Sequence, residues 1–192
     1  MERRVSDDKK LHAYIVGLAL GDGNLSNQNG RTVRLRITCD KKYSILNKYI
    51  FDSLQKFLPD NSVFMVESKT SVDIVCYSNK LEKLLGWEAK GGSKYKQKVK
   101  IPKWILSSKI YTKECLRGLV QTDGSIFTDR GYKIVNIASN IESLAKTIVS
   151  AIISIGYKPN MQIHQDPKTQ KHTIRISKNT SKFIKDIEVW RK

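Results

Sequence analysis

The chain has 192 residues, a length that allows one large domain or two small ones with real hydrophobic cores. Hydrophobic residues make up 40% of it and charged residues 28%, which is typical of a globular protein and excludes an intrinsically disordered one. The formal net charge is +17, from 35 lysines and arginines against 18 aspartates and glutamates. An excess of this size favours a polyanionic partner: DNA, RNA or an anionic membrane surface.

Membrane-spanning, secreted and zinc-binding proteins are excluded next. The longest nearly apolar runs, 13–21 and 148–156, are shorter than the ~20 residues of a membrane-spanning helix. The N-terminus lacks the apolar region of a secretory signal. Cys39, Cys76 and Cys115 lie far apart, so we interpret them as buried thiols that form neither a zinc site nor a disulfide framework. We expect an intracellular protein, of an archaeal or bacterial cytoplasm or an organelle, in which carboxylates bind any metal.

The first half of the chain predicts helix, two strands, helix, two strands, helix. The first helix is the apolar stretch from Leu11 to the Asp22-Gly23 pair. A strand over 31–38 alternates apolar and polar side chains, and a helix over 44–58 is stopped by Pro59. Strands over 62–68 and 71–77 form a hairpin, and a short helix covers 80–85.

The second half repeats this order. Asp123-Gly124 follows Asp22-Gly23 by 101 positions, and each pair ends a segment of the pattern G-L-x-x-(G/T)-D-G. Downstream we expect elements at matching offsets: a strand over 131–139, a helix over 141–155, strands over 158–164 and 171–177, and a helix over 180–189. The predicted organisation is a first repeat over 1–86, a basic linker over 87–110 and a second repeat over 111–192.

The linker is rich in lysine. Residues 90–113 contain eight lysines and no acid, and Lys94, Lys96, Lys98 and Lys100 alternate with other residues. In an extended segment this spacing places all four ammonium groups on one side. A solvated linker and a phosphate-facing strand both fit the composition, and the alternation favours the strand.

The two Asp-Gly helices predict a shared metal site. Gly17-x-x-x-Gly21 places two residues without side chains on one helix face, and Gly118-x-x-x-Thr122 repeats the pattern less strictly. Such faces allow two helix backbones to approach closely. Asp22 and Asp123 would then meet at the negative ends of both helices, where they repel unless cations lie between them. The glycine after each Asp suits a left-handed residue at the end of a helix.

Both segments resemble the LAGLIDADG motif of homing endonucleases, and the whole chain is similar to the single-chain members of that family with two motifs. The sequence departs from the family motif at Leu20-Gly21-Asp22 and Gln121-Thr122-Asp123, although the final acid and glycine are present in both copies. The stretch 98–105 resembles the basic segment that precedes the second motif in intron- and intein-encoded relatives. The resemblance implies an α+β fold of two pseudo-symmetric αββαββα repeats, in which two four-stranded antiparallel sheets form a DNA-binding saddle with helices on one face.

The resemblance also implies a partner and a DNA-contacting face. The partner is double-stranded DNA with a long target site, bound by a monomer with internal pseudo-twofold symmetry. Side chains of the outer strand faces, together with linker lysines, are the expected contacts, since Arg pairs with guanine and Asn or Gln with adenine. They are Arg34, Arg36, Thr38, Tyr77, Lys94, Lys96, Asn136, Gln162, His164, Arg175 and Ser177.

The implied reaction is hydrolysis of one phosphodiester in each strand, which leaves 3′ overhangs. In the family the last acid of each motif binds a divalent metal together with the preceding carbonyl, which assigns Asp22 with Gly21 and Asp123 with Thr122. Mg²⁺ or Mn²⁺ is the implied cofactor, with Ca²⁺ binding without supporting cleavage. Basic catalytic residues are expected at Lys98 or Lys100. Asp40, Asn140 and Lys192 are expected at the periphery of the site.

Two other functions remain open on the same fold. An RNA-binding intron maturase would use the basic surface on intron RNA, with or without DNA cleavage. A non-cleaving DNA-binding protein would keep the sheets and lack the reaction. Loss of a motif acid would favour either, and since Asp22 and Asp123 are both present, an intron-encoded homing endonuclease is the main hypothesis.

Overall fold

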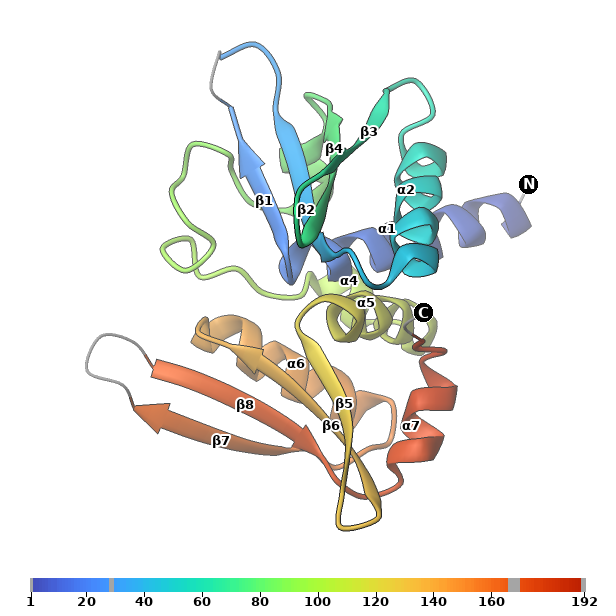
Figure 1. The fold of residues 1–192 in the computed structure, drawn as a ribbon, viewed down its shortest axis with the longest axis vertical. Helices are drawn as coiled ribbons and strands as arrows, with labels where there is room; N and C mark the ends of the chain where they lie inside the picture. Colours follow the sequence, from blue (N-terminus) through green and yellow to red (C-terminus); the bar gives the residue numbers. More distant parts are fainter. Residues whose placement is uncertain (1, 28–29, 166–169, 191–192) are drawn as a thin grey trace.

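The computed structural model describes residues 2–27, 30–165 and 170–190, and at residues 2–6 it describes the backbone only. It contains two copies of one αββαββα arrangement, which confirms the predicted fold class (Figure 1). The strands of each copy form one four-stranded antiparallel sheet, in the order β1-β2-β4-β3 in the first and β5-β6-β8-β7 in the second.

The elements of the first repeat follow the expected order. They are α1 (Glu2–Leu20), β1 (Gly23–Ser26), β2 (Arg34–Asp40), α2 (Ser44–Phe57), β3 (Val63–Glu67), β4 (Ser71–Tyr77) and α3 (Leu81–Leu85). Helix α2 buries Leu46, Ile50 and Leu54 at helical spacing and ends two residues before Pro59, which cannot continue a helix. Helix α1 begins earlier than its apolar stretch predicted, because a polar first half continues the same helix.

The second repeat has the same order. Its elements are α5 (Lys109–Thr122), β5 (Gly124–Asp129), β6 (Tyr132–Ser139), α6 (Glu142–Ser154), β7 (Asn160–Gln165), β8 (Gln170–Ile176) and α7 (Thr180–Asp186). Helix α6 buries Leu144, Ile148 and Ile152 and is followed by Gly156 with φ 95°, a conformation that favours glycine. The turn predicted at Asp166-Pro167 lies outside the described residues.

Helices α1 and α5 pack against each other at the centre of the molecule, between the two sheets (Figure 1). The buried residues of both repeats join in one hydrophobic core around this pair, to which α1 contributes Ala13 to Leu20. None of the described helices is both long and apolar enough to cross a membrane. The helix pair therefore fixes how the two sheets are placed relative to each other.

The segment between the repeats packs against the second repeat. It contains the short helix α4 (Lys103–Leu106), and Val99, Ile101 and Ile105 are buried. The N–H of Ile101 donates to Thr147 Oγ1 at 3.1 Å, and Ser143 Oγ donates to the carbonyl of Val99 at 2.9 Å, so α6 holds the segment.

Its lysines do not form the predicted phosphate-facing strand. Backbone hydrogen bonds from Gln97 to Ser93 (3.1 Å) and from Val99 to Lys94 (3.2 Å) fold the segment into consecutive turns, and Lys98 has φ 49°. The expectation of an extended row of ammonium groups is therefore wrong. Lys94 points into the protein, whereas Lys96, Lys98 and Lys100 remain exposed.

Candidate active site at the ends of the paired helices

Close contact between the backbones of α1 and α5 brings the two motifs together. A Cβ added to Gly17 would lie 2.1 Å from the carbonyl oxygen of Cys115, and one added to Gly118 would lie 2.5 Å from that of Tyr14. A Cβ on Gly21 would lie 2.0 Å from Thr122 Oγ1. Each of these distances is far below a van der Waals contact, so only glycine allows the helices to approach this closely.

Asp22 and Asp123 follow the last turns of these helices and lie on either side of the contact. The ideal Cβ position at Gly21 is 3.5 Å from the carboxyl carbon of Asp123, which places the second motif's acid beside the end of the first motif's helix. Gly23 and Gly124 do not have the expected left-handed conformation, since neither has a positive φ. They are glycines because their strands start against the preceding helix: a Cβ would lie 2.5 Å from the carbonyl oxygen of Ala19 or of Val120.

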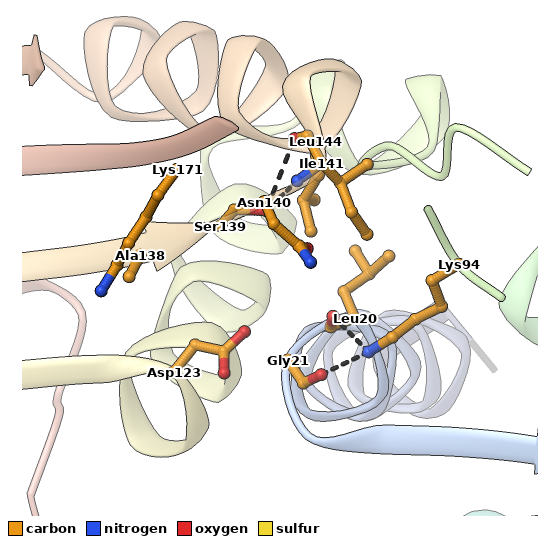
Figure 2. A pocket seen from close by; sticks show the side chains of 10 residues that line it. All are labelled: Leu20, Gly21, Lys94, Asp123, Ala138, Ser139, Asn140, Ile141, Leu144 and Lys171. Atoms are coloured by element: carbon orange, nitrogen blue, oxygen red, sulfur yellow. Dashed lines mark hydrogen bonds between the residues drawn. The ribbon is translucent and has the colours of Figure 1, made fainter. Parts of the chain in front are cut away.

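A pocket of about 330 Å³ lies at Asp123, and we refer to it as the Asp123 pocket (Figure 2). Leu20 and Gly21 of the first motif line one side of it, and β6 and the start of α6 line the other. Its lining residues are Leu20, Gly21, Lys94, Asp123, Ala138, Ser139, Asn140, Ile141, Leu144 and Lys171. Asp123 therefore shares its pocket with the carbonyl end of α1.

Lys94 occupies this end of α1. Its Nζ donates to the carbonyl oxygens of Leu20 at 2.7 Å, Ala19 at 3.1 Å, and Gly21. Figure 2 shows the ammonium group at the last turn of α1, with the Asp123 carboxylate on the opposite side of the same pocket. Burial lowers the pKa of Lys94, and the negative charges of Asp123 and then Asp22 oppose this shift.

A matching pocket of about 190 Å³ lies at Asp22, and we refer to it as the Asp22 pocket. Its lining residues are Asp22, Thr38, Cys39, Asp40, Lys42, Tyr43, Leu46, Asn47, Ile50, Gln121 and Thr122. Burial, together with the charges of Asp22 and Asp73, raises the pKa of Cys39 to about 12, so this side chain stays a neutral thiol. The oxygen groups of the pocket are thus the cation ligands available in it.

The two pockets combine the motifs crosswise. Asp22 shares its pocket with Thr122, and Asp123 shares its pocket with Gly21. The sequence expectation paired each acid with the carbonyl that precedes it, Asp22 with Gly21 and Asp123 with Thr122. The pocket linings favour the crossed combination, and the oxygen atoms that would hold a metal stay a prediction.

The donor set fits a hard divalent cation with few protein ligands. Among the described residues, no three His, Cys, Asp or Glu side chains gather at one point. Each pocket offers a motif carboxylate, and the Asp123 pocket adds the carbonyl oxygens of Leu20 and Gly21, which are ligands that Mg²⁺ accepts while it keeps several waters. The Lys94 ammonium against the carbonyl of Gly21 shows that a cation can be accommodated at the Asp123 pocket.

The other expected site residues are divided between these pockets and the surface. Asp40 lines the Asp22 pocket and Asn140 the Asp123 pocket. Lys98 and Lys100 are exposed and line neither pocket. Lys192 lies outside the described residues. Lys171 also lines the Asp123 pocket and was not among the predicted site residues. The alternation of side chains along β8 could have indicated it, since it places Lys171 on the same face as Thr173 and Arg175.

The register of the first sheet gathers the residues predicted to contact DNA. Arg34 lies opposite Tyr77 and Thr38 opposite Asp73, so the four candidates occupy the face that points away from the buried Leu35 and Ile37. These are Arg34, Arg36, Thr38 and Tyr77. Phe64 and Val66 of β3 lie on the same face and are exposed, a pair of apolar residues that the sequence reasoning did not include.

The second sheet presents its candidates in the same way. Asn136 lies opposite Arg175, and Gln162 lies opposite Thr173 on the same face. His164 and Ser177 continue this alternation. Two buried atoms on these faces, Arg36 Nε and Asn136 Oδ1, have no hydrogen-bond partner within the described part of the chain. Unsatisfied polar atoms are expected where a surface binds a polar ligand.

Comparison with known proteins agrees with this architecture. The model of the LAGLIDADG-like domain matches residues 111–188. The structure of I-DmoI in complex with DNA and Mn is similar over 96% of this chain and 99% of that one, with a TM-score of 0.72 and 17% identity. The family model thus covers the second repeat, and the structural likeness to I-DmoI covers both repeats.

Other solved structures share the fold. I-DmoI in complex with DNA and Ca is similar over 93% of this chain and 87% of that one, with a TM-score of 0.68 and 17% identity. The N-terminal LAGLIDADG domain of WhiA is similar over 96% of this chain and 85% of that one, with a TM-score of 0.62 and 16% identity. A comparison with curated protein sequences gives no match. At these identities the structural likeness establishes the two-repeat fold.

Proposed function

We propose that this chain is a site-specific endonuclease, an intron-encoded homing endonuclease, that cuts both strands of a long double-stranded DNA target and leaves 3′ overhangs. The observation that carries the proposal is the meeting of Asp22 and Asp123 at the ends of two closely packed helices, each in a pocket with the carbonyl end of the other helix. Two separated sites, one in each pocket, are what the cleavage of two strands requires.

The sheets supply the binding surface for this reaction. Their polar faces carry arginine, asparagine and glutamine side chains that can contact base edges in the major groove. The apolar Phe64 and Val66 suit contact with thymine methyl groups. The net charge of +17 attracts the phosphate backbone and makes affinity depend on salt.

The pockets supply the reaction site. Asp22 with the carbonyl of Thr122, and Asp123 with the carbonyl of Gly21, would hold divalent ions, Mg²⁺ or Mn²⁺. A bound divalent ion lowers the pKa of its water and stabilises charge on the scissile phosphate. The carboxylates orient the ion, and the helix contact fixes the distance between the two sites. Lys98 and Lys100 stay predictions for the basic catalytic residues, and Asp40 and Asn140 for the pocket periphery.

The cofactor proposal is supported by the similar structures. I-DmoI was solved with DNA and Mn, and with DNA and Ca, and a variant of I-DmoI with its target DNA in the presence of Mg. We propose Mg²⁺ as the working cofactor and expect Ca²⁺ to support DNA binding without cleavage. The protein acts as a monomer, since both repeats lie in one chain.

The test is cleavage of a diverse DNA library, including intronless copies of candidate host genes, with Mg²⁺ and sequencing of the cut ends. We expect one staggered cut site, lost on addition of EDTA and in the Asp22→Asn and Asp123→Asn variants. DNA binding with no cut under any metal condition, in the wild type as in both variants, would contradict the nuclease.

A second candidate is a DNA-binding protein that does not cleave. One observation favours it: Lys94 fills a cation position in the Asp123 pocket. This candidate predicts salt-sensitive binding of duplex DNA that is unchanged by Asp22→Asn and Asp123→Asn. The library experiment therefore distinguishes the two.

A further inference from the structure

The two pockets carry opposite charge, although the repeats that form them are built alike. Asp22 and Asp40 place two carboxylates in the Asp22 pocket against the ammonium of Lys42. The Asp123 pocket has one carboxylate against the ammonium groups of Lys94 and Lys171. The charged side chains that line the pockets therefore favour a divalent cation in the first pocket over one in the second.

The lysines of the two pockets are also held differently. Lys42 is exposed, on the loop between β2 and α2, and its Nζ bonds Asp40 at 2.7 Å, so it neutralises a neighbour at the rim. Lys94 is partly buried and its Nζ donates to three consecutive carbonyl oxygens at the end of α1. The last carbonyls of a helix lack N–H partners within the helix and form the negative end of its dipole, so they bind a cation well.

The ammonium of Lys94 thus uses the ligands that a metal ion would use. A divalent ion in the Asp123 pocket needs the carbonyl of Gly21 and the carboxylate of Asp123. Lys94 already donates to that carbonyl, and its charge interacts with Asp123 more strongly than with Asp22. Two cations cannot share one carbonyl oxygen at contact distance, because their repulsion in a partly buried site is strong.

We propose that Lys94 is a tethered cation that holds the Asp123 pocket in place of a divalent ion, so that the chain without DNA binds a single divalent ion, in the Asp22 pocket. The proposal rests on the proposed function only in treating the two pockets as the divalent-ion sites of a nuclease. The two halves of the pseudo-symmetric fold then differ in the cation that each pocket contains. The Asp22 pocket binds a divalent ion from solution, and the Asp123 pocket contains the ammonium group of Lys94 from the linker between the repeats.

The test counts the Mn²⁺ ions bound by the full chain without DNA, by electron paramagnetic resonance of the free ion and by calorimetry. We expect one ion in the wild type, two in Lys94→Met, and one in the control Lys90→Met, an exposed lysine of the same segment. In the background that keeps Lys94, Asp22→Asn should lose the ion and Asp123→Asn should keep it. Thermal unfolding of each variant establishes that it is folded.

Several outcomes would overturn the proposal. Two ions in the wild type, an unchanged count in folded Lys94→Met, or equal losses in Asp22→Asn and Asp123→Asn each contradict it. If Lys94→Met does not fold, the two aspartate variants decide the matter by themselves. Two bound ions in a wild type that cuts DNA would overturn this inference alone. Failure of every variant to bind Mn²⁺ would overturn it together with the metal-dependent reaction.

Discussion

The close approach of α1 and α5 makes Gly17→Ala a sensitive perturbation of both stability and activity. The new Cβ would lie 2.1 Å from the carbonyl oxygen of Cys115 and 2.9 Å from its carbonyl carbon, both backbone atoms that cannot rotate away. A carbon needs about 3.3 Å from such an oxygen, so the helices must separate by about 1 Å. Overpacking of this kind costs about 1–3 kcal/mol and at times more, whereas replacing glycine by alanine within a helix returns up to about 1 kcal/mol.

We therefore expect a net loss of about 1–2 kcal/mol in the free energy of unfolding, or about 2–8 °C in Tm for a chain of this size. The separation also moves Asp22 away from Thr122, so cleavage should fall by more than the fraction of unfolded protein explains. Urea unfolding and the cleavage assay measure the two effects, with Lys9→Ala on the exposed side of the same helix as the control. A Gly17→Ala protein as stable and as active as the wild type would refute the assigned packing of the two helices.

Three further predictions concern the site, the sheet surface and pH. Asp22→Asn and Asp123→Asn should each reduce double-strand cleavage by about 10²–10³-fold, the loss of several kcal/mol of charge stabilisation, while DNA binding measured by electrophoretic shift is kept. Arg175→Ala, which leaves its partner Asp129 on the surface, should weaken binding of the specific DNA target by about 1–3 kcal/mol if the arginine contacts a base edge. An equal loss of affinity for all DNA sequences, with the slope of log K against log salt concentration smaller by about 1, would identify a phosphate contact instead. Burial lowers the pKa of His12 below its ordinary 6.5, so the folded state binds the proton less readily than the unfolded chain. The contribution of neutral His12 to the free energy of unfolding is therefore complete above pH 6.5 and is lost as the pH falls toward the folded-state pKa. Urea unfolding from pH 7.5 to 5.5 should show this loss, and a His12→Phe variant with the same pH dependence would argue against it.

The internal repeat and the local patterns of the chain determined the fold. Alternation in 31–38, helical spacing up to Pro59 and the glycine at 156 are short-range signals, and the elements that they predict are found within a few residues of the expected bounds. The glycines of the two motifs also predicted the helix contact, because glycine inside a helix is destabilising and close approach of another backbone is a reason to keep it. Asp22 and Asp123 as the central acids followed from the same repeat.

Tertiary structure alone decided how the motifs combine. The crosswise pairing of Asp22 with Thr122 and of Asp123 with Gly21 depends on which helix end faces which acid, and this is set by packing between segments about a hundred positions apart. The same holds for the linker: alternation of its lysines indicated a strand, yet turns over 93–99 aim Lys94 at the end of α1. A sequence pattern records which side chains share a face of one element. It does not show which carbonyl oxygens at the end of a helix a distant lysine will contact, because that contact depends on the position of every element between them.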